Sequence, residues 1–181
     1  MNKLRFVALA VGIVCATFVI QTQSAPAPIL VVVNSSSSNP YGSYLAEILR
    51  AEGINSFSTA QLSSVTSTTL SNASLVILAE TSLSATQAQL FSNYVGAGGR
   101  LIAMSPDPDL ASTLGLIPAS GTTSEGYLGI NTNSLIGEGL PATTLPFHGS
   151  AQHHNLQPGA VAVAGLYSNR TTATAFPAVV K

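Results

Sequence analysis

A strand–helix–strand pattern between residues 29 and 57 is the feature that most constrains how this chain can fold. Residues 29–33 are five consecutive apolar residues, three of them valine, which is typical of a strand buried on both faces. A polar loop at residues 34–39 and an amphipathic segment at residues 41–52 follow. A second strand at residues 54–57 would complete a parallel β-α-β unit with a crossover helix.

The helix of this unit has start and stop signals in the sequence. Asn39 is expected to cap the first free N–H groups, and Pro40 to take the first helical position. Gly53 is placed to end the helix in a left-handed conformation. The apolar residues that share one predicted buried face are Tyr41, Tyr44, Leu45, Ile48 and Leu49.

The first 24 residues have the pattern of a signal peptide. Lys3 and Arg5 precede an uncharged apolar run at residues 6–20, and a polar segment with small residues follows. The run is short for a membrane span, which needs about 20 residues. We therefore expect cleavage after Ser24, a secreted, extracellular protein, and contact with the membrane only during export. An uncleaved anchor is the alternative.

Composition limits the chemistry of the exported part, residues 25–181. The only cysteine of the chain, Cys15, lies in the apolar N-terminal run, so cysteine chemistry is not expected after export. Charged residues make up 7% of the chain, against a usual value of about 25%. The sequence has no basic patch, so nucleic acid is not an expected partner. No cofactor is predicted.

Three histidines lie close together in the sequence, at positions 148, 153 and 154. Three imidazoles could bind a transition metal if the segment folded back on itself. Adjacent histidines of a strand point to opposite faces, however, so His153 and His154 would not easily share one ion. We interpret these residues as polar loop histidines and predict no metal site.

Further apolar runs predict the rest of an α/β domain. Strands are expected at residues 75–79 and 100–104, with a helix between them that begins at a capping box of Ser84 and Gln87. Asp107 would cap a short helix, and residues 60–74 would be a loop with one helical turn. Additional short strands are expected at residues 127–130, 144–147, 161–167 and 175–180. This alternation of strands and helices indicates an α/β protein with a mainly parallel sheet.

Several of these segments carry a family pattern. They include YLAEILRAEG at residues 44–53, GGRLIAM at residues 98–104 and FHG at residues 147–149, together with residues 29–34, 75–80, 166–168 and 171–177. Together they resemble the class I glutamine amidotransferase-like domain of secreted bacterial multidomain proteins, related to ThuA-like domains and to the trimerisation domain of some β-galactosidases. The resemblance covers most of residues 29–181. It implies a flavodoxin-like three-layer sandwich and further strands beyond Lys181, so that residues 25–181 would be an incomplete domain.

The resemblance also implies where a catalytic nucleophile would lie. Active members use a cysteine on a tight strand-to-helix turn, with a histidine and an acid. The corresponding turn here reads Ala103-Met104-Ser105-Pro106-Asp107. Ser105 could replace the cysteine, but a nucleophile turn uses the N–H of the next residue for its oxyanion, and Pro106 has none. Amidotransferase catalysis is therefore not expected.

Polar residues that follow the predicted strands form the candidate ligand site. Ligands of open α/β sheets bind beyond the carboxyl ends of the strands, and the hydroxyls, amides and helix N-terminus there favour a carbohydrate or a small anion. The alternative is a solvated loop that only caps the helix. The family pattern adds a histidine to the set, as a structural or site-lining residue. The candidates are Asn34, Ser35, Ser36, Asn39, Tyr41, Glu80, Thr81, Ser105, Asp107 and His148.

These observations leave more than one function open. The leading hypothesis is a non-catalytic exported domain that serves as a ligand-binding or interaction module of a larger secreted protein, with neighbouring domains as partners. The alternative is a carbohydrate-linked hydrolase in which Glu80, Asp107 and His148 act with residues beyond Lys181, because paired carboxylates can perform acid–base chemistry on sugars. An inert spacer is a third hypothesis.

Overall fold

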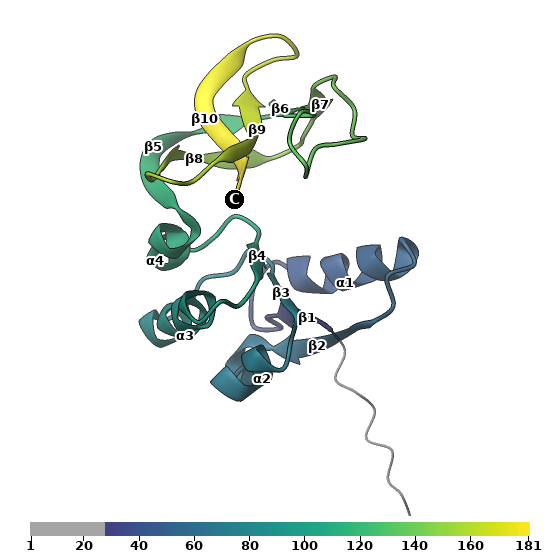
Figure 1. Ribbon diagram of the computed structural model, residues 1–181, viewed down its shortest axis with the longest axis vertical. Coiled ribbons are helices and arrows are strands. Elements are labelled where there is room, and N and C mark those ends of the chain that lie inside the picture. Colours follow the sequence, from purple (N-terminus) through teal and green to yellow (C-terminus); the bar gives the residue numbers. More distant parts are fainter. Residues whose placement is uncertain (1–27) are drawn as a thin grey trace, which may run out of the picture.

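The computed structural model describes residues 28–181, so the predicted signal peptide and Cys15 lie outside the described residues. Within this range a four-stranded parallel sheet has the strand order β2-β1-β3-β4 (Figure 1). The strands are β1 (Ile29–Val33), β2 (Phe57–Gln61), β3 (Leu75–Leu78) and β4 (Leu101–Ala103). The predicted parallel β-α-β unit is confirmed, with β1 in the middle of the sheet between β2 and β3.

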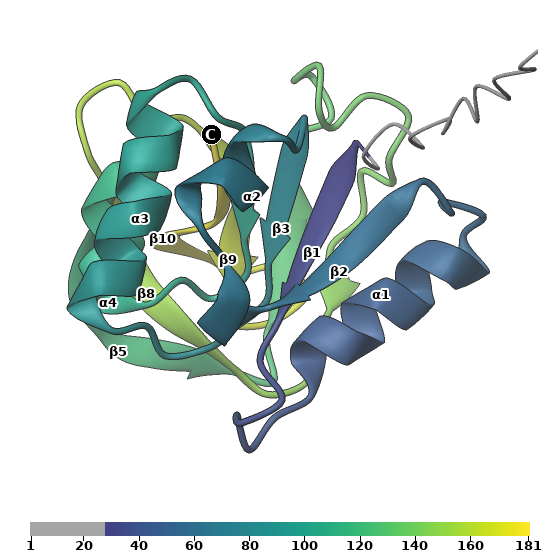
Figure 2. The same ribbon diagram turned by 90° about the horizontal axis from the view of Figure 1, so that it is seen from below.

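Helices cover both faces of this sheet. Helix α1 (Tyr41–Ala51) lies on one face, and α2 (Ser67–Ser71) and α3 (Ala85–Gly96) lie on the other (Figures 1 and 2). A short helix α4 (Pro108–Ala111) follows β4 and continues into a 3-10 turn at Ser112–Leu114. The parallel part of the chain is therefore an α/β layered structure, as predicted.

The main hydrophobic core lies between the sheet and the face covered by α2 and α3. Alternate residues of each strand point to this face, and the helices supply fully buried side chains in return. Its buried members are Leu30, Val32, Leu62, Leu70, Val76, Leu78, Phe91 and Leu110. The capping box of Ser84 and Gln87 that begins α3 is present as predicted.

Helix α1 begins one residue later than predicted. The carbonyl of Pro40 accepts hydrogen bonds from Ser43 N–H (2.9 Å) and Tyr44 N–H (3.1 Å), so Pro40 is the capping residue and Tyr41 the first helical residue. The prediction that Asn39 caps this helix was wrong. Its side-chain oxygen is buried and has no hydrogen-bond partner within residues 28–181.

The buried face of α1 also differs from the prediction. Tyr41, Tyr44 and Ile48 are 46%, 52% and 55% exposed. The buried residues of the helix are Gly42 and Ala46. The reason is a close approach of helix and strand, because a Cβ atom added at position 42 would lie 2.9 Å from the Cα of Val33. Small residues therefore face β1. Leu45 and Leu49 of the predicted face are half-buried, whereas Tyr41, Tyr44 and Ile48 are displaced towards solvent.

The second half of the chain is antiparallel. In the described residues it forms a sheet of order β10-β9-β6-β7 and a β5-β8 pair, which lie beyond the β4 end of the parallel sheet (Figure 1). The strands are β5 (Leu116–Ser124), β6 (Tyr127–Ile130), β7 (Leu145–Pro146), β8 (Ser150–Leu156), β9 (Ala162–Tyr167) and β10 (Ala173–Val180).

Several predicted boundaries need correction. Strands were expected at four places in the antiparallel half and are found there, but β5 and β8 were not predicted. Strand β2 begins at Phe57, three residues later than expected, and continues into the segment predicted as loop. That segment also contains α2, whose start is capped by the Thr66 hydroxyl accepting from the N–H of Thr69 at 3.1 Å.

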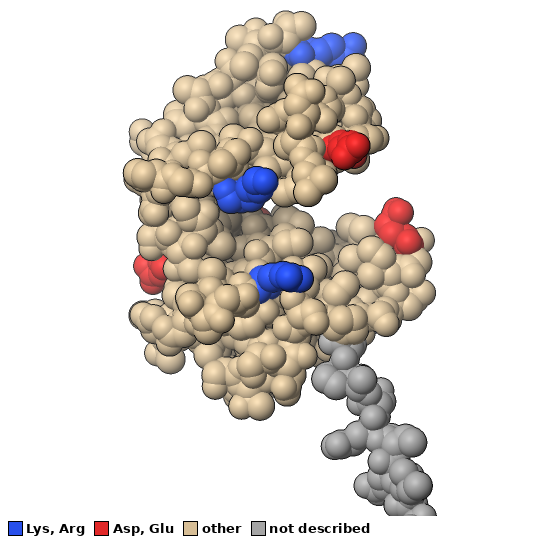
Figure 3. All heavy atoms as spheres, in the orientation of Figure 1, with Lys and Arg blue, Asp and Glu red and all other residues tan. Residues whose placement is uncertain are grey.

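The surface carries few charges. Figure 3 shows a face on which isolated basic and acidic groups lie far apart, with a hollow between the parallel and antiparallel parts. In residues 28–181 the one pairing of a basic with an acidic side chain is that of His148 with Glu125, which is ionic only when His148 is protonated. Across the same residues, the helices are all too short or too polar to span a membrane.

Candidate functional site at the carboxyl edge of the sheet

Side-chain hydrogen bonds connect the loops at the carboxyl ends of neighbouring strands. The loop after β1 is tied to β2 because the N–H of Ser35 donates to Oε1 of Gln61 (3.1 Å). It is tied to the loop after β3 because Nδ2 of Asn34 donates to the hydroxyl of Thr81 (2.8 Å). Two of the predicted site residues, Asn34 and Thr81, are therefore in direct contact at this edge.

Asp107 connects the loop after β3 to the turn that follows β4. Its Oδ2 accepts from the N–H of Leu83 (3.0 Å), in the loop after β3, and its Oδ1 accepts from the N–H of Asp109 (3.0 Å). The predicted capping of α4 by Asp107 is confirmed. Because both carboxylate oxygens accept backbone hydrogen bonds, Asp107 holds two loops together and has limited capacity left for a substrate.

Ser105 lies on the turn between β4 and α4 in a left-handed backbone conformation, with a φ of 42°. Glu125 is the other non-glycine residue with positive φ in the part of the chain that the structure describes. Such a conformation is strained for a residue with a side chain. The turn thus has the sharp backbone of a nucleophile turn, but the next residue is Pro106, which has no N–H to donate.

The other candidates at this edge are mostly open to solvent. Ser35 and Ser36 are exposed, and the N–H of Ser36 donates to Oδ1 of Asn34 (3.1 Å). Tyr41 is 46% exposed, and Glu80 is also exposed. These side chains leave hydroxyl, phenol and carboxylate groups free to contact a ligand.

His148 lies on the turn between β7 and β8. Its Nδ1 is 2.7 Å from Oε2 of Glu125, and Oε1 of the same carboxylate accepts from the N–H of Gly149 (2.7 Å). The N–H of Glu125 in turn donates to the carbonyl of Gly149 (2.9 Å). Within residues 28–181, no hydrogen bond joins His148 to the candidates at the carboxyl edge.

The contacts of Glu125 lower its pKa. The hydrogen bond from Gly149 N–H is the largest cause, and the hydrogen bond from His148 adds to it. An Nδ1 held by a carboxylate leaves Nε2 of His148 free, as in a histidine oriented for proton transfer or metal binding. The side chains are 92% and 63% exposed, however, so water has full access to the pair.

Glu125 was not among the predicted site residues. It is 23 positions from its partner, and the two meet only because β5 and β8 pair with Ser124 opposite Ser150. The sequence marks Glu125 only by its position, because Glu125 and Gly126 come just before the strand predicted at residues 127–130. As for metals, the described chain contains no group of three or more His, Cys, Asp or Glu residues that could hold an ion.

The fold is similar to that of a known enzyme, at low sequence identity. A glutamine amidotransferase from Thermotoga maritima matches with a TM-score of 0.53 and 16% identity, covering 78% of this chain and 72% of that chain. A β-galactosidase from Bifidobacterium adolescentis matches over 87% of this chain and 89% of that chain, with 15% identity and a TM-score of 0.41, too low to support an argument. No protein-family model matches, and a search of curated sequences found no significant match.

The first of these similarities supports a class I glutamine amidotransferase-like α/β fold, as the sequence resemblance implied. At this level of identity it establishes the fold alone. The chemistry of the relative cannot be transferred to this chain on that basis.

Proposed function

We propose that this α/β fold serves as a non-catalytic ligand-binding or interaction module of an exported protein, with the carboxyl edge of the parallel sheet as its ligand site. The observation that carries the proposal is the turn after β4. Ser105 has the strained backbone of a nucleophile position, with a φ of 42°, while Pro106 removes the oxyanion donor. A site shaped for a ligand but without the groups for acyl transfer fits binding better than hydrolysis.

The hydrogen bonds along the edge support the same proposal. Bonds between Ser35 and Gln61, between Asn34 and Thr81, and between Leu83 and Asp107 fix loops that would otherwise be ordered by the ligand. A preorganised site loses less conformational entropy on binding. Exposed hydroxyls and carboxylates suit a carbohydrate. The N–H groups of Ser35, Ser36 and Ser37 already donate within the protein, so a small anion would bind through the exposed serine hydroxyls. Neighbouring domains of the same protein are the proposed macromolecular partners.

The test is a binding screen of the full chain against neutral sugars and small anions, measured as a shift in melting temperature. We expect a stabilising ligand whose effect is lost in Ser36→Trp, which places a bulky side chain in the loop after β1. Ser56→Trp, an exposed serine before β2 at the opposite edge, is the matched control and should retain the shift. No shift with any ligand, or equal loss in both variants, would overturn the proposal.

A second candidate function rests on the pairing of His148 with Glu125. A carboxylate that holds Nδ1 orients the imidazole as a general base, which favours a hydrolase that uses His148. The carboxylate partner of His148 is Glu125, whereas Asp107 accepts from Leu83 and Asp109, so in the described residues no hydrogen bond joins the predicted trio of Glu80, Asp107 and His148. Turnover of a glycan or amide substrate by the full chain, abolished in His148→Ala and retained in His154→Ala, would support this function. Absence of turnover would leave the binding module as the better account.

A further inference from the structure

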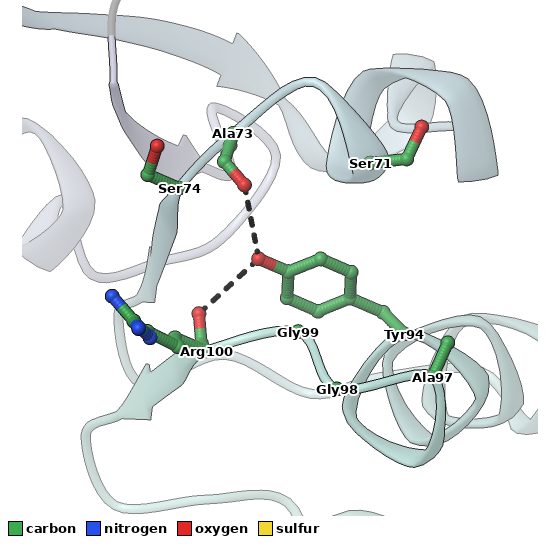
Figure 4. Close-up of a pocket in the computed structure, with 8 residues that line it drawn as sticks. All are labelled: Ser71, Ala73, Ser74, Tyr94, Ala97, Gly98, Gly99 and Arg100. Atoms are coloured by element: carbon green, nitrogen blue, oxygen red, sulfur yellow. Dashed lines mark hydrogen bonds between the residues drawn. The ribbon is translucent and has the colours of Figure 1, made fainter.

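A cavity lies at the opposite edge of the parallel sheet, where the strands begin. It is wide open to solvent and has a volume of about 470 Å³, so a ligand bound there would remain partly exposed to water. Ser74 and Arg100 line it just before β3 and β4, Ser71 lines it at the end of α2, and Tyr94 reaches into it from α3 (Figure 4). It shares no residue with the carboxyl-edge site and stands independently of the proposed function.

The hydroxyl of Tyr94 lies between two backbone carbonyls of the cavity. The hydroxyl of Tyr94 lies 3.4 Å from the carbonyl of Ala73 and 3.3 Å from the carbonyl of Arg100. Both are long for an O–H···O bond, for which about 2.7–2.8 Å is usual. A phenol has one proton and can satisfy only one carbonyl at a time. The carbonyl of Arg100 also accepts a shorter hydrogen bond from the N–H of Val76 (2.9 Å), so it does not depend on the phenolic proton. Among the described residues, the long contact with Tyr94 is the hydrogen bond given for the carbonyl of Ala73, and a ligand hydroxyl that donates to this oxygen would improve the arrangement.

One end of the cavity is positively charged. The side chain of Arg100 extends on the Ser74 side, away from the Tyr94 ring (Figure 4). In residues 28–181 no acidic side chain forms an ion pair with Arg100, so its guanidinium is available. A guanidinium forms two parallel hydrogen bonds with a carboxylate, which makes this group the natural partner of that end.

We infer that this cavity binds a hydroxylated carboxylate of monosaccharide size, that is, a sugar acid. A ligand hydroxyl donates to the carbonyl of Ala73 beside Tyr94, and the ligand carboxylate pairs with Arg100. The hydroxyl of Ser71 donates to the carbonyl of Thr68 (3.1 Å), so its oxygen remains an acceptor for a further ligand hydroxyl. The combination of both ligand groups is what distinguishes a sugar acid from a neutral sugar or a simple acid.

The experiment is a calorimetric titration of the full chain with D-galacturonate, with D-galactose and acetate as partial ligands. We expect galacturonate to bind at least about tenfold more tightly than either comparison compound, since each lacks one of the two interactions. Arg100→Ala should weaken galacturonate binding by about tenfold or more, and Tyr94→Phe by a smaller factor. Arg170→Ala removes the same charge from an exposed turn and should leave binding unchanged.

Amide chemical shifts locate the site directly. Galacturonate should shift the signals of Ser74, Gly98 and Gly99 and leave those of Ser35 and Ser36 in place. Equal loss of affinity in the Arg100 and Arg170 variants, or no binding to the wild-type chain, would overturn the inference. Shifts confined to Ser35 and Ser36 would also overturn it while supporting the carboxyl-edge site, so the two proposals fail separately.

Discussion

The side-chain amide of Asn34 donates a hydrogen bond of 2.8 Å to the hydroxyl of Thr81, although the two residues are 47 positions apart. We expect this bond to stabilise the fold by about 1 kcal/mol, as is usual for a partly buried hydrogen bond. Urea unfolding of Asn34→Ala, Thr81→Val and the double variant should reveal a coupling of that size. Ser38→Ala, in the same loop, should change the free energy by less than about 0.5 kcal/mol. Strictly additive effects would show that the bond contributes nothing.

Asp107 is expected to be a stability residue. Its two oxygens accept from the N–H groups of Leu83 and Asp109, and loss of a capping carboxylate costs about 0.5–2 kcal/mol. Asp107→Ala should therefore lower the free energy of unfolding by about 1–2 kcal/mol. Asp109→Ala is the control, because it removes an exposed carboxylate from the same helix. Equal effects of the two variants would contradict this role.

Replacement of Ser105 by glycine should stabilise the protein. A left-handed conformation costs about 1–2 kcal/mol for a residue with a side chain, and glycine adopts it without strain, at some cost in unfolded-state entropy. We expect a net gain of about 0.5–1 kcal/mol in thermal or urea unfolding. Ser36→Gly, at a position without positive φ, should give no gain. A loss of stability in Ser105→Gly would mean that the serine side chain makes a compensating contact.

The pairing of Glu125 predicts a pH dependence of stability. Because hydrogen bonds from Gly149 and His148 lower its pKa in the folded state, the unfolded chain binds the proton first as the pH falls. The stabilisation is thus fully present above the ordinary carboxyl pKa and disappears as the pH falls through the lowered folded-state value. The difference in melting temperature between wild type and Glu125→Gln should shrink between about pH 6 and pH 3. Glu138→Gln, which removes an exposed carboxylate, should show a constant difference.

Two helical glycines should respond to alanine in opposite directions. A Cβ at Gly42 would meet backbone atoms of Val33 and Val32 at 2.9 and 3.1 Å, whereas one at Gly96 would meet nothing within 4 Å. Gly42→Ala should destabilise by about 1–3 kcal/mol through overpacking. Gly96→Ala should stabilise by up to about 1 kcal/mol through helix propensity. Similar results for both, measured by urea unfolding, would mean that α1 can move away from β1 at little cost.

Local signals explain why much of the parallel half could be predicted. The capping box of Ser84 and Gln87 and the left-handed Gly53 and Gly115 are encoded within a few residues, and the valine-rich run of β1 has no competing interpretation. The buried face of α1 could not be predicted this way. The helical periodicity of the apolar residues was predicted correctly. The close approach of Gly42 to Val33 turns a different face of the helix towards the sheet, and this approach is visible only in the tertiary structure.

The antiparallel half depends on distant pairing, which the sequence does not display. Strand β5 contains Pro118 and Gly121 and is largely exposed, so neither apolar runs nor alternation mark it. Contacts between candidate site residues were likewise predictable only where they follow from the strand order. Asn34 and Thr81 follow strands and could be expected at one edge, whereas Glu125 reaches His148 only through the β5–β8 pairing.

The bonds at the carboxyl edge also have a consequence for loop length. Thr81 contacts the loop after β1 and Leu83 contacts the loop after β4, so an insertion between them would separate two anchoring points that lie two residues apart. The loops after β1, β3 and β4 cannot then vary in length independently of one another. The fold should tolerate insertions where no bond to another loop is anchored, as at residues 36–38, even where such an insertion would disturb ligand binding.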